Sequence, residues 1–139
     1  MQKQENIKKN FQDLINHCLS MAEKLLLDQK EFYPFGAYLN NSGELTPGAL
    51  YGGDEFPFST NVITGLKVYF EKQLANQEIK AYAITFDTKV KNQNFPESIE
   101  AITIRIAHRD TGSIPNYYFP YKLKECQIEF FESWGEYSD

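Results

Sequence analysis

The apolar residues near the start of the chain recur every three or four positions. They are Ile7, Phe11, Leu14, Ile15, Cys18, Ala22, Leu25 and Leu26. This spacing places them on one face of a helix, and the charged residues of the segment fall largely elsewhere. We therefore predict an amphipathic helix over residues 6–27 that packs against another part of the chain or against a partner.

The composition then changes from helical to sheet-like. Of the 21 aromatic residues, 20 lie from Phe32 onward, interleaved with β-branched residues and turn formers. Residues 32–40 form a predicted strand, residues 41–43 a tight turn and residues 45–51 a returning strand in which Pro47 indicates an edge or a bulge. The first element of the sheet is thus a predicted hairpin.

A second helix is predicted after the loop over residues 52–57. Ser59 or Thr60 can cap its first turn by accepting a hydrogen bond from a free backbone N–H. Its apolar stripe consists of Ile63, Leu66, Phe70 and Leu74.

From Ile79 onward the apolar period is two, which is typical of strands. Residues 81–90 and 101–108 each have one bulky apolar face and one small or polar face. Further strands are predicted over residues 116–121, interrupted at Pro120, and over residues 127–134, with a bulge at the paired phenylalanines.

The predicted element order is α-ββ-α-ββββ within a single domain over residues 1–139. Because strands and helices do not alternate, the sheet of about six strands should be antiparallel. We expect an α+β fold with both helices packed on one face of that sheet.

The charge of the chain lies mainly at its C-terminal end. There are 14 basic and 19 acidic residues, and the segment 125–139 contains five acids and no base. This balance argues against a nucleic-acid partner and against an anionic membrane surface. The chain contains no apolar run of membrane-spanning length and no secretory signal at its start, so we expect a cytoplasmic protein.

The loop over residues 51–57 is the first candidate site. Its adjacent glycines allow unusual backbone conformations, and the carboxylates of Asp54 and Glu55 could bind a cation or act as acid and base. The structural alternative is that acids before a helix stabilise its N-terminus.

His108, Arg109 and Asp110 form a second candidate site at a strand end. An imidazole oriented by a carboxylate can transfer protons, although a hydrogen-bonded, partly buried histidine is the structural alternative. No nucleophile motif, phosphate loop or Cys/His cluster is present. We assign no catalytic residue, no metal site and no cofactor.

The C-terminal segment is the third candidate. Glu129, Glu132 and Trp134 combine acids with an aromatic ring, as in a surface that binds a basic protein. The structural alternative is an edge strand whose glutamates prevent edge-to-edge pairing.

Several segments together carry a resemblance. These are EFYPFGAYL at 31–39, GDEFP at 53–57, IKAYAITFD at 79–87 and SIEAITIRIAHRD at 98–110. The chain resembles a group of small bacterial cytosolic α+β proteins without an assigned activity, and in size and acidity it is similar to immunity proteins that neutralise polymorphic toxins. The resemblance implies a bacterial origin and an α+β fold, and it supplies no catalytic residues.

Our leading hypothesis is a non-enzymatic interaction protein, of the immunity-inhibitor type, that binds a basic partner through its C-terminal region. The alternative is a small enzyme or ligand-binding domain that uses the Gly52–Glu55 loop and His108. Self-association through the first helix is a third alternative, which would make the protein a homo-oligomer.

Overall fold

The fold is described from a computed structural model, which covers residues 2–32, 34–47, 59–111 and 114–138. Its elements are α1 (Gln2–Gln29), β1 (Phe35–Asn40), β2 (Leu45–Pro47), α2 (Ser59–Ala75), β3 (Ile79–Val90), β4 (Ile99–His108), β5 (Ile114–Lys124), β6 (Gln127–Phe130) and β7 (Trp134–Ser138). The predicted α+β class and the order of helices and strands are confirmed. The predicted last strand over 127–134 is two strands, β6 and β7.

The sheet is antiparallel, with strand order β2-β1-β3-β4-β5-β6 and with β7 also paired to β5. The length of β5 explains this branch, because β7 pairs with its first half and β6 with its second half. Pro120 does not interrupt β5 as predicted. Its carbonyl accepts a hydrogen bond from the backbone N–H of Phe131 at 2.9 Å, just where the chain leaves β6.

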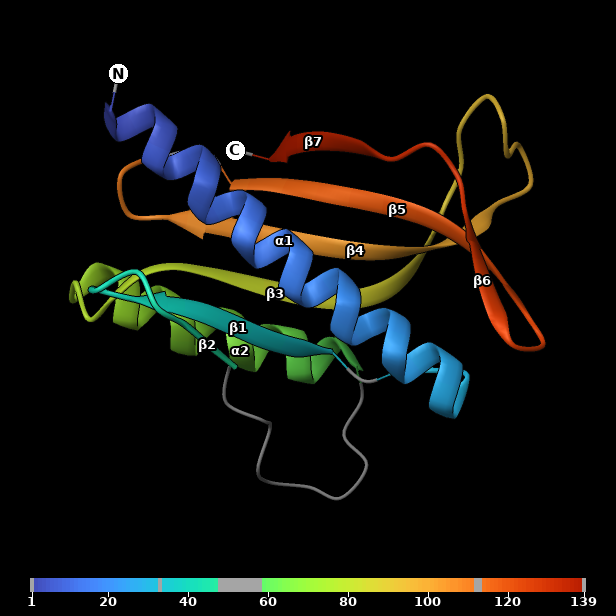
Figure 1. The fold of residues 1–139 in the computed structure, drawn as a ribbon, viewed down its shortest axis with the longest axis horizontal. Coiled ribbons are helices and arrows are strands. Elements are labelled where there is room, and N and C mark those ends of the chain that lie inside the picture. The colour runs from blue at the N-terminus through green and yellow to red at the C-terminus, as the bar shows by residue number, and fades with distance from the viewer. Residues whose placement is uncertain (1, 33, 48–58, 112–113, 139) are drawn as a thin grey trace.

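The two helices lie on opposite faces of the sheet, so the prediction that both cover one face is wrong (Figure 1). The cause is the strand register, which pairs Ala83 of β3 with Ile106 of β4. The small side chains of β3 and the isoleucines of β4 share the face of α1. The bulky Tyr82 and Ile84 of β3 therefore face α2. Each face of β3 thus contributes to its own buried cluster.

Helix α2 packs on β1 and β3, with Leu66 and Phe70 buried and the rest of its predicted stripe packed beside them. Phe70 lies directly over Gly36 of β1 and stacks on Tyr82 at 5.1 Å between ring centroids. The absence of a side chain at Gly36 is what allows the helix to come this close. The predicted stripe of the second helix is confirmed.

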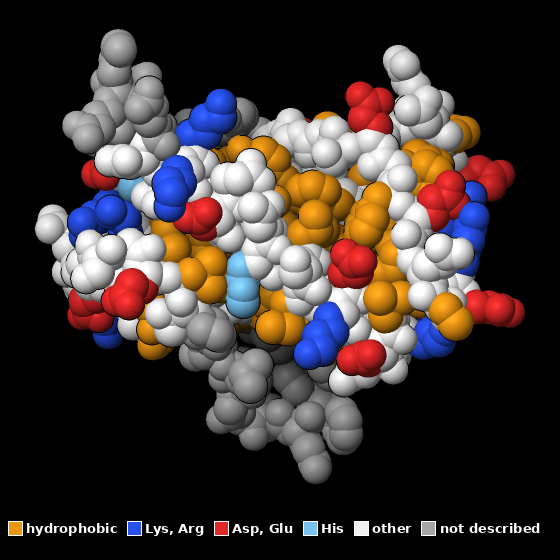
Figure 2. All heavy atoms as spheres, viewed as in Figure 1, with side chains coloured by type: hydrophobic (Ala, Val, Ile, Leu, Met, Phe, Trp, Pro, Cys, Tyr) orange, Lys and Arg blue, Asp and Glu red, His pale blue; other side chains and the backbone are white. Residues whose placement is uncertain are grey.

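On the face that α2 covers, its buried cluster also includes Ala107 at the end of β4 and, at its margin, Ile114 at the start of β5. Two cross-strand rows lie on this face, namely Arg105–Asn116–Glu136 and Thr103–Tyr118–Trp134. The opposite face, which α1 crosses, has hydrophobic side chains among interspersed charges of both signs (Figure 2). Neither α1 nor α2 is long and apolar enough to span a membrane.

Candidate functional site

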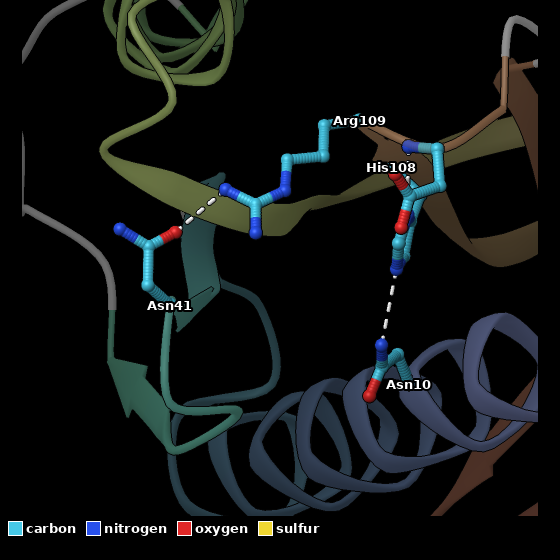
Figure 3. Close-up of polar contacts among 5 residues, drawn as sticks. Asn10, Asn41, His108 and Arg109 are labelled. Carbon is cyan, nitrogen blue, oxygen red and sulfur yellow. Dashed lines mark hydrogen bonds and ion pairs between the residues drawn. The ribbon is translucent and has the colours of Figure 1, made fainter. Parts of the chain in front are cut away.

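His108 is buried at the end of β4, only 2% exposed, and its ring is held from two sides (Figure 3). Nδ1 accepts a hydrogen bond from the backbone N–H of Asp110 at 3.0 Å, and the side-chain amide of Asn10 lies 3.0 Å from Nε2. The Asp110 carboxylate is 3.9 Å from Nδ1. This arrangement links α1 to β4. Because the residue is almost fully buried, a substrate could not approach the ring in this conformation.

Arg109 points away from His108. Its guanidinium Nη1 donates to Oδ1 of Asn41 in the turn between β1 and β2, at 2.7 Å, so the two neighbouring side chains diverge (Figure 3). Asp54 and Glu55 lie outside the described residues. The described part of the second candidate site is therefore a structural junction between α1, β4 and the first hairpin.

A pair of carboxylates that sequence reasoning missed lies on the α1 side of the sheet. The Tyr121 hydroxyl lies 3.0 Å from Oδ1 of Asp87 and 3.1 Å from Oε2 of Glu100. One hydroxyl proton can serve only one of these acceptors at a time. Burial raises the pKa of Asp87 to about 6, with the Glu100 charge acting in the same direction, although part of the Asp87 side chain stays open to solvent.

The two cysteines differ sharply in environment, and neither is in a disulfide. Cys18 is fully buried in the core beneath α1, and burial raises the pKa of its thiol to about 11. Cys126 is exposed in the turn between β5 and β6. No cluster of three or more metal-binding side chains occurs in the described ranges.

The two acids singled out in the C-terminal segment have different surroundings. Glu129 of β6 pairs with Lys124 of β5 at 2.6 Å, and this hydrogen bond holds the pKa of the exposed Glu129 below its usual range. Glu132 is exposed after β6 and makes no hydrogen bond or ion pair with another residue that the structure describes. Only Glu132 therefore keeps its charge available to a ligand.

Glu132 and Trp134 line the same groove, which has a volume of about 460 Å³. One wall is the β3–β4 connection and the other is the β6–β7 connection. Its lining consists of Asn92, Gln93, Asn94, Phe95, Phe131, Glu132, Ser133 and Trp134. Its volume is within the range of small-molecule sites, and its lining combines three aromatic residues with five polar ones.

The aromatic walls of the groove are held by contacts with one another and with the sheet. Phe95 meets Phe131 edge to face, with ring centroids 5.1 Å apart. Trp134 packs on Tyr118 of β5 at 5.2 Å, and its indole N–H donates to Glu136 at 3.3 Å. Trp134 also belongs to the Thr103–Tyr118–Trp134 row, so the groove borders this row of the sheet.

The β3–β4 wall is fixed by its own asparagine. Oδ1 of Asn92 accepts from the backbone N–H groups of Asn94 and Phe95 at 2.8 and 2.9 Å. This turn fixes the backbone conformation of the loop in the absence of a ligand. This segment was not among the candidate sites predicted from the sequence, and its two asparagines, Asn92 and Asn94, before Phe95 were the signal available.

Comparison of the chain with protein-family models, with curated proteins and with solved structures finds no match.

Proposed function

We propose that this chain is a non-enzymatic interaction protein of the bacterial cytosol, of the immunity-inhibitor type, which binds a basic protein partner at the groove between residues 92–95 and 131–134. The observation that carries the proposal is the position of Glu132 beside Trp134 in one aromatic groove. Aromatic residues such as Trp134 are enriched at interfaces, and the unpaired Glu132 carboxylate beside it adds a charge that selects a partner of opposite sign.

The surroundings of the groove favour a basic partner. The segment 125–139 carries five acids and no base, so it attracts positive charge over a distance. Opposite charge speeds the encounter of two proteins and excludes partners of the wrong sign. Toxins that act on nucleic acid have basic surfaces and suit such a site.

The rival hypothesis of a small enzyme draws little support from His108. Its ring is buried and oriented by Asn10 and by the backbone of Asp110. A general base must reach the proton that it removes, and this ring faces helix α1.

The test begins with affinity capture from a lysate of the source organism, followed by identification and purification of the captured protein. Calorimetry then measures its binding to the wild-type chain and to Glu132→Lys. We expect a basic partner whose affinity for Glu132→Lys falls by a factor of about ten or more, since a like charge replaces an attraction. An unchanged affinity would refute the proposed site.

Glu132→Gln, which only neutralises the charge, is measured beside Glu132→Lys, and Glu129→Gln is the matched control for that variant. Both glutamates are exposed and lie three positions apart, but Glu129 is engaged by Lys124. Its neutralisation should change the affinity by no more than about twofold. Equal losses in Glu129→Gln and Glu132→Gln would indicate that only the overall negative charge matters.

A further inference from the structure

We infer that the groove takes an arginine side chain of the partner, with the guanidinium placed against the aromatic walls and paired with the Glu132 carboxylate. This inference rests on the proposed function and specifies the chemistry of its anchor. The choice of arginine follows from the flat aromatic walls of the groove and from its hydrogen-bond acceptors.

The aromatic walls suit a flat cation. Phe95, Phe131 and Trp134 all line the groove, and a guanidinium stacks on such rings through dispersion and cation–π attraction. One of these rings already interacts with a cation from outside the groove, because Nζ of Lys122 lies 5.8 Å from the centroid of Phe131.

The polar lining supplies four acceptor oxygens for the donors of an arginine side chain. A guanidinium presents five N–H donors in one plane. Glu132 offers two carboxylate oxygens, and the side-chain amides of Gln93 and Asn94, both exposed, offer one oxygen each. A carboxylate takes a guanidinium through two parallel hydrogen bonds, which an ammonium group cannot form.

The alternatives fit less well. An anionic ligand would meet the uncompensated charge of Glu132 without a cation from the lining, since none of the eight lining residues is basic. A purely apolar side chain would bury that carboxylate without a partner, which costs free energy. A lysine ammonium group would pair with the Glu132 carboxylate. It is a compact charge, however, so it would not stack on the flat aromatic walls and would leave the amide oxygens without donors.

The test is an NMR titration of the ¹⁵N-labelled full-length protein with the peptide acetyl-Gly-Arg-Gly-amide. The control peptide replaces arginine by citrulline, which has the same shape without the charge, and a second control replaces it by lysine. We expect saturable shifts of the Trp134 indole N–H and of the Gln93 and Asn94 side-chain amides, with a dissociation constant on the order of 1–10 mM. Binding of citrulline or of lysine with equal affinity would overturn the inference, as would the absence of saturable shifts with arginine.

Two variants locate the contact. Glu132→Gln should weaken binding of the arginine peptide by a factor of about three to ten, whereas Glu129→Gln should leave it unchanged. Both substitutions are at exposed positions, and the NMR spectrum of each variant shows directly that it is folded. Equal weakening in the two variants would contradict a specific pair with Glu132.

The result is separable from that of the capture experiment. A partner that depends on Glu132, combined with no binding of the arginine peptide, would leave the proposed function standing and refute the arginine anchor. Saturable arginine binding without any protein partner would refute the proposed function and retain the chemistry of the groove.

Discussion

Replacing Gly36 with alanine should destabilise the protein, although glycine-to-alanine changes at unstrained positions usually stabilise by about 0.4–1 kcal/mol. A Cβ at Gly36 would lie 2.8 Å from Cζ of Phe70 and closer still to Cε2. Carbon atoms in contact normally lie about 3.5–4.0 Å apart, so the ring or the strand must move by roughly 1 Å. Phe70 is fully buried and stacked on Tyr82, so it has little room to move.

Overpacking of this kind costs about 1–3 kcal/mol, and the expected net destabilisation is about 1–2 kcal/mol after the glycine gain is subtracted. For a chain of 139 residues this corresponds to a fall in Tm of roughly 3–7 °C. Urea denaturation followed by far-UV circular dichroism measures the difference in free energy of unfolding between wild type and Gly36→Ala.

The Phe70→Leu background isolates the contact. Leucine removes the ring atoms that a Cβ would strike, so Gly36→Ala should be nearly neutral or stabilising in that background. Equal costs in both backgrounds, or an increase in stability in the wild-type background, would refute the close packing of α2 on β1.

Three further substitution and labelling experiments concern Asp87, Asn10 and the two cysteines. Because the pKa of Asp87 in the folded protein is raised from 3.8 to about 6, its contribution to stability is present below about pH 4 and is lost as the pH rises through about 6. Thermal unfolding of Asp87→Asn should therefore lack this fall between pH 4 and pH 7, and an identical fall in wild type and variant would contradict the assignment. Asn10→Leu removes the contact with His108 Nε2 and should lower the free energy of unfolding, measured by urea denaturation, by about 1–2 kcal/mol. Unchanged stability would show that this contact does not stabilise the fold. Ellman's reagent should modify Cys126 in the native protein but Cys18 only after denaturation, because Cys18 is buried and burial raises the pKa of its thiol to about 11. Rapid modification of both thiols in the native protein would show that α1 does not bury Cys18.

The helices were predictable because their apolar periods are strong and local. The first helix was expected over residues 6–27 and extends over Gln2–Gln29, and the stripe that contains Phe70 packs as expected. Boundaries within the C-terminal strands were harder to place. The segment 127–134 divides because β5 is long enough to pair with two different strands, and its length depends on long-range pairing.

The placement of the helices on opposite faces was not predictable from single strands. Each strand alone shows one bulky and one small face, which suggests one covered side. Only the register, with Ala83 opposite Ile106, shows that the bulky faces of β3 and β4 point in opposite directions. That register is a property of the pairing between the two strands and is not visible in either strand alone.

The candidate site was predictable in part. Glu132 and Trp134 were chosen from the acidic, aromatic character of the C-terminal segment, and the structure places both in one groove. Phe95 and the asparagine turn form the opposite wall, and their proximity comes from the sheet rather than from any local motif. His108 and Arg109 are neighbours in sequence, but strand geometry directs them to different partners.

Hydrogen–deuterium exchange of the protein with its purified partner tests most directly whether the groove is the functional surface. The account predicts that partner binding slows exchange in residues 92–95 and 131–134, because both connections form the walls that the partner would cover. The same measurement on Glu132→Lys should show this protection lost at equal protein concentrations. Protection confined to other segments, with residues 131–134 exchanging as in the free protein, would contradict the central claim.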